Sequence, residues 1–285
     1  MSRRHILVLS CADRPGIVAA VAGHIARSGG NITESSQFND PDTDRFFLRT
    51  GFALADGADE PALRAGFDAL AAEYGMTLSL RPADLRPRVL ILVSKFDHCL
   101  VDLLYRQRIG ELDMEVAGIV SNHGLPALGN ADFGAIPFHH LPVTPETKAA
   151  QEERLLALVD ESRADLVVLA RYMQILSDDL AAALSGRCIN IHHSFLPSFK
   201  GARPYHQAHD RGVKLIGATA HYVTADLDEG PIIEQDVERI SHADTPDDLV
   251  RKGRDIERRV LARAVGLHLQ GRVLMNGRRT VVFRD

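Results

Sequence analysis

Several features that would assign this sequence to a special class of protein are missing from its 285 residues. No apolar run approaches the roughly 20 residues that cross a membrane. The short apolar stretch near the N-terminus lacks the small-residue cleavage site of a signal peptide. The net charge of −5 gives no general reason to expect nucleic-acid binding. We therefore expect a cytoplasmic globular protein with neither membrane nor nucleic acid as a partner.

Cysteine and metal-binding motifs are also scarce. Cys11, Cys99 and Cys188 are odd in number and far apart, which is typical of unpaired thiols in a reducing compartment. Buried apolar thiols are commoner than catalytic ones. The histidine pairs at 139–140 and 192–193 form no standard zinc motif. We therefore expect no catalytic cysteine and no required metal.

Glycine is missing from one turn where phosphate-binding enzymes often need it. Residues 89–93 predict a buried strand, and a helical pattern begins near His98. Many α/β enzymes hold a phosphate at such a junction, using a glycine-rich turn and the helix N-terminus. The turn here is Ser94-Lys95-Phe96-Asp97-His98. An aromatic ring and a carboxylate oppose close approach of a phosphate, so this turn predicts no phosphate loop.

The N-terminal part of the chain predicts a small α+β domain. Strands are expected at residues 5–11, 31–38, 45–54 and 76–82, with helices beginning near Ile17 and spanning 61–75. The order strand, helix, strand, strand, helix, strand is the ferredoxin-like arrangement. We expect this domain to cover residues 1–82, followed by a proline-containing linker at 83–87.

Strands and helices alternate over residues 88–285. This alternation favours an α/β domain with a doubly wound, mostly parallel sheet. A long helix is expected from about Thr245 to Leu269, and its charge run at 251–264 indicates a solvated face. A hairpin with an Asn276-Gly277 turn is expected to follow. The expected strands are 89–93, 115–120, 136–141, 165–170, 188–192 and 216–223.

Two segments of this second domain carry candidate chemistry. Asn190 and His192 alternate with isoleucines, which places both side chains on one face of a strand, near its carboxyl end. Asp228 lies in a turn farther along the chain. An amide beside an imidazole can stabilise an oxyanion and move a proton, and a carboxylate can orient the imidazole. Each feature alone is more often structural, so their ordered combination carries the hypothesis.

That combination resembles the folate-dependent formyltransferase family. Residues 189–202, INIHHSFLPSFKGA, and residues 217–233, GATAHYVTADLDEGPII, follow the family's order of an Asn-x-His pair, a proline-containing turn and an Asp-x-Gly loop. The resemblance covers about residues 88–285 and implies that Asn190, His192 and Asp228 are catalytic. His193 departs from the transferase pattern, in which a proline often follows the histidine.

The resemblance also implies a substrate site. Residues 169–176, LARYMQIL, are similar to the family segment that holds the pterin ring. Phe96, with Asp97 and His98 of the turn without glycine, is expected to close off the space that a phosphorylated acceptor would otherwise enter, leaving room for water beside Asp228. The expected substrate-binding residues are Arg171, Tyr172, Met173, Ile175, Leu176, His221 and Phe96.

Residues 13–32, DRPGIVAAVAGHIARSGGNI, resemble the ACT domain, a small regulatory module that often binds amino acids between two copies. The resemblance implies a homo-oligomer, either a dimer or a tetramer. A packing role without any ligand is the alternative. An amino-acid effector would be held by Asp13, Arg14, Pro15, Gly16, Asn31 and Ile32.

An ACT domain joined to a formyltransferase-like domain resembles the formyltetrahydrofolate deformylase family. The resemblance implies hydrolysis of 10-formyltetrahydrofolate to tetrahydrofolate and formate, a one-carbon reaction linked to purine biosynthesis. The folate is then the substrate, and no separate cofactor is expected. Without a phosphate loop for an acceptor, water is left as the nucleophile. Two alternatives are a formyltransferase to an unidentified amine and a folate- or amino-acid-sensing regulatory protein with little turnover.

Overall fold

The computed structural model describes residues 3–129, 132–196 and 204–284. The chain divides into two compact units. One comprises Met1–Leu85, Gln270–Asn276 and Val281–Asp285, and the other comprises Arg86–Leu269 and Gly277–Thr280. This division differs at the C-terminus from the expected second domain of 88–285, because most of the terminal hairpin belongs with the first unit.

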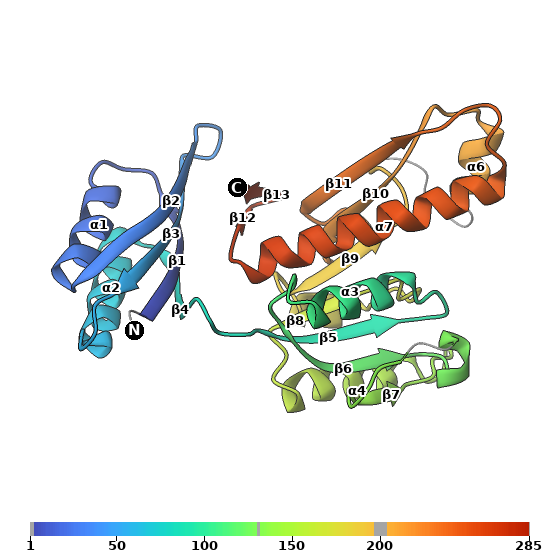
Figure 1. Ribbon diagram of the computed structural model, residues 1–285, viewed down its shortest axis with the longest axis horizontal. Coiled ribbons are helices and arrows are strands. Elements are labelled where there is room, and N and C mark those ends of the chain that lie inside the picture. Colours follow the sequence, from blue (N-terminus) through green and yellow to red (C-terminus); the bar gives the residue numbers. More distant parts are fainter. Residues whose placement is uncertain (1–2, 130–131, 197–203, 285) are drawn as a thin grey trace. The chain divides into compact units, whose positions relative to one another are not determined.

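The first unit is a four-stranded antiparallel sheet with strand order β2-β3-β1-β4. Ile17, Val21 and Ile25 of one helix and Leu63 and Phe67 of the other are buried against the sheet, so both helices cover its apolar face (Figure 1). This arrangement confirms the ferredoxin-like prediction. The elements are β1 Arg3–Ala12, α1 Ile17–Arg27, β2 Gly30–Asp40, β3 Arg45–Leu54, α2 Glu60–Tyr74 and β4 Thr77–Pro82.

The terminal hairpin consists of β12 Val273–Asn276 and β13 Arg279–Val282. Gly277 has a φ of 61°, as the predicted Asn-Gly turn requires. Leu274 and Phe283 are buried with Phe47 of β3. This apolar cluster explains why most of the hairpin belongs with the first unit.

The second unit contains a seven-stranded sheet with strand order β11-β10-β9-β8-β5-β6-β7. The five strands from β9 to β7 are parallel, and β10 and β11 are antiparallel additions at one edge. The mostly parallel sheet is therefore confirmed. The strands are β5 Arg88–Val93, β6 Glu115–Ser121, β7 Phe138–His140, β8 Leu166–Leu169, β9 Cys188–His192, β10 Leu215–Tyr222 and β11 Ile232–Arg239.

Helices cover both faces of this sheet. Buried residues of α4 and α5 cluster with Leu90, Leu92 and Val167 on one face, and α3 and α7 pack together on the other (Figure 1). Within the described ranges, no helix has both the length and the apolar character needed to cross a membrane. The helices are α3 His98–Arg108, a short 3-10 turn Leu125–Leu128, α4 Lys148–Glu161, α5 Asp178–Ala183, α6 Pro204–Asp210 and α7 Pro246–Leu269.

Candidate active site

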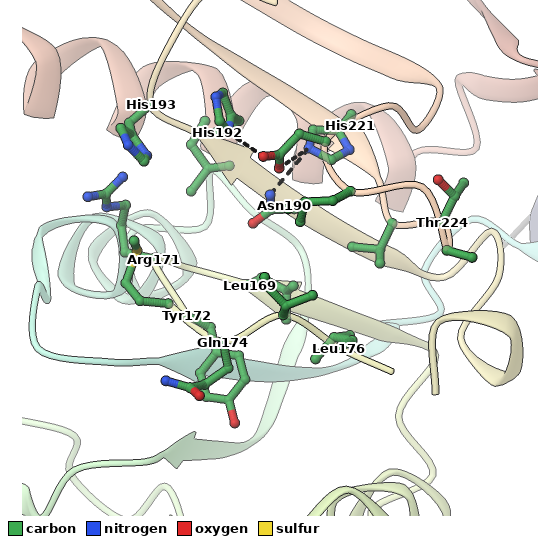
Figure 2. Close-up of a pocket in the computed structure, with 17 residues that line it drawn as sticks. Leu169, Arg171, Tyr172, Gln174, Leu176, Asn190, His192, His193, His221 and Thr224 are labelled. Carbon is green, nitrogen blue, oxygen red and sulfur yellow. Dashed lines mark hydrogen bonds and ion pairs between the residues drawn. The ribbon is translucent and has the colours of Figure 1, made fainter. Parts of the chain in front are cut away.

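A cavity of about 290 Å³ opens at the carboxyl ends of β8 and β9. Its walls come from the segment that follows β8, from the end of β9 with His193, and from the end of β10 with its following loop. Figure 2 shows these side chains around the cavity. Open α/β sheets bind ligands at this position, beside the point where the strand order reverses.

Asn190 and His221 face each other across neighbouring strands. The register of β9 and β10 pairs the two residues, and Asn190 Nδ2 lies 3.2 Å from His221 Nε2. His221 Nδ1 lies 2.9 Å from the carbonyl oxygen of Tyr222. Nδ1 must carry a proton to donate to that carbonyl, which leaves Nε2 to accept from the Asn190 amide. An amide nitrogen carries two hydrogens, and the second remains available for a substrate oxygen.

Asp228 lies between two histidines. Its Oδ2 is 3.2 Å from His192 Nδ1, and its Oδ1 is 3.7 Å from His221 Nε2. The backbone φ of Asp228 is 57°, a left-handed conformation that Asp and Asn adopt more readily than most residues. A Cβ at Gly230 would lie 1.7 Å from the carbonyl oxygen of Tyr222. Only glycine fits this close approach, which holds the loop and its carboxylate against β10.

His192 keeps Asp228 charged. Burial alone would raise the pKa of the Asp228 carboxyl, but the hydrogen bond from His192 and its positive charge outweigh burial, and the pKa lies below its ordinary value. His192 Nδ1 therefore donates to a carboxylate. Its Nε2 is buried and has no hydrogen-bond partner in the part of the chain that the structure describes. This nitrogen is available to a ligand in the cavity.

The predicted pterin-binding segment lines the cavity. The Tyr172 ring is buried in the apolar core, where its hydroxyl accepts a hydrogen bond from Gln151 Nε2 at 2.9 Å. Met173 and Ile175 leave 52% and 61% of their surface exposed, which offers apolar area to a flat ligand. Ser94, at the end of β5, anchors the segment by accepting from the backbone N–H of Met173 at 2.9 Å. The predicted residues that line the cavity are Arg171, Tyr172, Met173, Ile175, Leu176, Asn190, His192, His221 and Asp228.

Phe96 is not among the lining residues, although the sequence placed it there. It is 44% exposed, and the guanidinium groups of Arg171 and Arg254 lie 5.8 and 5.7 Å from its ring centre. Cation–π attraction therefore accounts for the position of this ring. Asp97 comes directly before α3 and adds negative charge at the helix N-terminus.

Two functional candidates received no role from the sequence. His193 lines the cavity beside His192. In the sequence, the one sign of this position was that His193 directly follows a predicted catalytic residue. Glu257 of α7 is 1% exposed, so the prediction of a solvated charge run was wrong at this position. Its carboxylate accepts from His98 Nε2 at 2.8 Å and from the Tyr205 hydroxyl at 2.7 Å. Further lining residues outside the prediction are Leu169, Gln174, Ile191, Val223, Thr224, Ala225 and Leu227.

Potential metal ligands meet in the same buried cluster. His98, Cys99 and Glu257 bring ligand-type atoms within 4.8 Å of one another. The Glu257 carboxylate is already hydrogen-bonded, however, and Arg171 Nε lies 3.4 Å from it. A guanidinium so close opposes a second cation, and the arrangement suits an ion pair better than a metal.

The expected effector residues are all exposed on the first unit. Asp13 accepts from Asn39 Nδ2 at 2.8 Å. Arg14 donates to the carbonyl oxygen of Glu73 at 2.9 Å. Asn31 and Ile32 lie on β2, an edge strand of the sheet. The remaining two, Pro15 and Gly16, precede α1.

Two protein families match this chain. Residues 87–265 match the family described as formyl transferase, and residues 5–65 match the ACT domain. A protein of Corynebacterium sp. (strain P-1) named formyltetrahydrofolate deformylase is 51% identical over 283 residues. The match covers 99% of this chain and 98% of that relative.

Solved structures give the same result. The crystal structure of formyltetrahydrofolate deformylase from Burkholderia mallei is 51% identical, with a TM-score of 0.94 that covers 99% of this chain and 100% of the other. The structure of glycinamide ribonucleotide transformylase 1 from Symbiobacterium toebii is 32% identical, with a TM-score of 0.65 over 70% of this chain and 95% of the other. These matches confirm the predicted resemblance. The chain belongs to the formyltetrahydrofolate deformylase family.

Proposed function

We propose that this protein hydrolyses 10-formyltetrahydrofolate to tetrahydrofolate and formate, with Asn190, His192 and Asp228 as its catalytic residues. Family membership supports the reaction. The observation that supports these residues is the half-buried Asp228 carboxylate, held between His192 and His221 at the edge of the cavity. A carboxylate, an imidazole and a free amide hydrogen are the groups that water needs to attack an amide carbonyl.

Asn190 stabilises the negative charge that develops on the formyl oxygen. One of its amide hydrogens is donated to His221 Nε2, at 3.2 Å. The other is free to donate to the oxygen of the tetrahedral intermediate. Because the contact to His221 fixes the amide plane, this donor is oriented before the substrate binds. Removing one such donor typically lowers the rate about a hundredfold to a thousandfold.

His192 and Asp228 manage the protons. Asp228 holds the imidazole through Nδ1, and its negative charge offsets the positive charge that the ring carries during proton transfer. His192 Nε2 then faces the reacting group and delivers a proton to the folate nitrogen as the C–N bond breaks. Water supplies the oxygen of formate, and the proton that it loses returns to the His192–Asp228 pair. The starting state is thereby restored without any cofactor.

Water is the nucleophile because the turn after β5 offers no site for a phosphorylated acceptor. Asp97 places negative charge at the N-terminus of α3, where a phosphate would otherwise bind. The next residue, His98, directs its side chain to the buried Glu257 at 2.8 Å. The turn therefore helps to fix α3 against α7 and leaves no glycine-lined space for an anion.

The test is turnover without an acceptor. Purified protein supplied with 10-formyltetrahydrofolate should release formate and tetrahydrofolate in equal amounts. A protein that binds the folate but releases formate only after an amine is added is a transferase. A protein that binds it without turnover is a sensor. Either result would reject the hydrolase.

The first unit serves assembly and regulation in this proposal. Its ACT domain suits an amino-acid effector bound between copies, and the exposed edge strand β2 suits pairing with a second copy. We expect a dimer or a tetramer in the cytoplasm. Light scattering at micromolar concentration tests this assembly, and a monomer there would reject it.

A further inference from the structure

A second histidine lies beside the proposed catalytic one. His193 lines the cavity, and its ring stacks on the His192 ring with centroids 5.1 Å apart and planes inclined by 25°. A second ring contact, to Tyr205, has a centroid distance of 6.4 Å. In the view of Figure 2, His193 and Arg171 lie toward one end of the cavity and Thr224 and Leu176 toward the other, with Asn190 and His221 between.

Burial and nearby positive charge hold the His193 ring neutral. Burial, the positive charge of Arg171 and the neighbouring His192 lower the pKa of His193 to about 4. Arg171 is itself held in place, with Nε 3.4 Å from the Glu257 carboxylate. Glu257 is fixed in turn by His98 and Tyr205. Arg171 is thereby kept near His193, where its charge adds to the effect of burial, and the imidazole retains an unprotonated nitrogen at neutral pH.

Hydrolysis needs a group that orients the attacking water. Arg171 has only donors, and the Asn190 amide nitrogen also donates. His192 commits Nδ1 to Asp228 and needs Nε2 for the folate nitrogen. A neutral imidazole offers one acceptor and one donor, which is the pair that a water molecule matches.

We infer that His193, which lines the cavity beside His192, holds the attacking water through a ring nitrogen at the end of the cavity next to Arg171. The inference rests on the proposed hydrolysis. The water oxygen bonds to the formyl carbon, and the bond from that carbon to the folate nitrogen breaks. One water proton reaches the folate nitrogen through His192 and Asp228, and formic acid loses the second to solvent. His193 gains no proton overall, because its role is to orient the nucleophile.

The test compares two substitutions of nearly equal size. His193→Asn keeps one acceptor and one donor, whereas His193→Leu has neither. We expect kcat for formate release to fall about a hundredfold in His193→Leu and less than about tenfold in His193→Asn. The affinity for tetrahydrofolate should stay within about threefold of wild type in both, because neither change touches the pterin-binding segment.

Partition between two nucleophiles separates water positioning from damage to the site. Hydroxylamine brings its own nitrogen to the formyl carbon and produces N-hydroxyformamide and tetrahydrofolate. Because the catalytic trio remains intact, His193→Leu should raise the ratio of N-hydroxyformamide to formate about tenfold or more over wild type. General damage would lower both products equally and leave the ratio unchanged.

Three results would overturn the inference. One is a His193→Leu enzyme whose formate release stays within about threefold of wild type. Another is an equal loss in His193→Asn and His193→Leu, which would assign the role to ring shape. The third is an unchanged product ratio. A wild-type protein that releases no formate would instead reject the proposed hydrolysis itself, so the two failures are distinguishable.

Discussion

Replacing Asp228 with asparagine removes one charge from the proposed active site and changes little else. Asparagine tolerates the left-handed backbone, with a φ of 57°, that this position requires. Its side-chain oxygen can still accept from His192 Nδ1, which lies 3.2 Å from the carboxylate. The fold and the cavity should therefore survive, and any loss of activity should reflect the missing charge.

The distance between Asp228 and His192 sets the size of the effect. Two unit charges 3.2 Å apart attract by about 5 kcal/mol at an effective dielectric constant near 20, an upper limit for how much Asp228 stabilises the charged form of His192. Since each 1.36 kcal/mol changes a rate tenfold, the limit corresponds to a loss of about 10³ to 10⁴. We expect turnover to fall by about two to four orders of magnitude.

The assay measures the initial rate of formate release at saturating substrate, together with tetrahydrofolate affinity. Asp226→Asn is the matched control, because Asp226 lies in the same loop, is exposed and does not line the cavity. The control should match wild type, and Asp228→Asn should bind tetrahydrofolate normally. Turnover of Asp228→Asn within about threefold of wild type would refute the role of this carboxylate in proton transfer.

Three further predictions follow from the same geometry. The pKa of Asp228 is lowered in the folded protein, so its contribution to the free energy of unfolding should be complete above about pH 4 and decline as the pH falls further. Denaturant titrations of wild type and Asp228→Asn measure this contribution as the difference between their free energies of unfolding. A difference that grows in acid would contradict the prediction. Gly230→Ala places a Cβ 1.7 Å from the Tyr222 carbonyl oxygen, so thermal unfolding should show a free energy of unfolding lower by about 1–3 kcal/mol, together with lost activity. In the control Gly124→Ala, the nearest heavy atom to the new Cβ is 3.7 Å away, and neither stability nor activity should change. Glycinamide ribonucleotide should be neither formylated nor an effective competitor at millimolar concentration, because Asp97 repels its phosphate; formation of the formylated ribonucleotide in a product assay would contradict this.

Local patterns were sufficient to predict much of the fold. The alternation along 188–192 placed Asn190 and His192 on the wall of the cavity, and β3 spans the predicted residues 45–54. Strand β11 was not predicted, because it is an edge strand rich in charged residues and its partly buried side chains form no clear apolar pattern. Helix α6 has seven residues, too few to show a helical period.

Contacts between distant parts of the chain could not be predicted. The spacing of Asp228 and His221 gives no sign that a tight loop at Gly230 folds the carboxylate back onto the histidine. Glu257 lies in a run of mixed charges, and only the packing of α7 buries it. Likewise, the Phe96 ring lies against the guanidinium groups of two arginines on other elements and does not line the cavity. Each of these positions depends on tertiary neighbours that local periodicity does not record.

The source of the oxygen in formate tests the central claim most directly. The enzyme is incubated with 10-formyltetrahydrofolate in ¹⁸O-labelled water without any amine, and the product is analysed by mass spectrometry. Attack by water at the Asn190–His192–Asp228 site predicts one labelled oxygen in each formate released, with one tetrahydrofolate formed for each. Formate that carries no label, or a formyl group that leaves the folate only when an amine is supplied, would contradict the account.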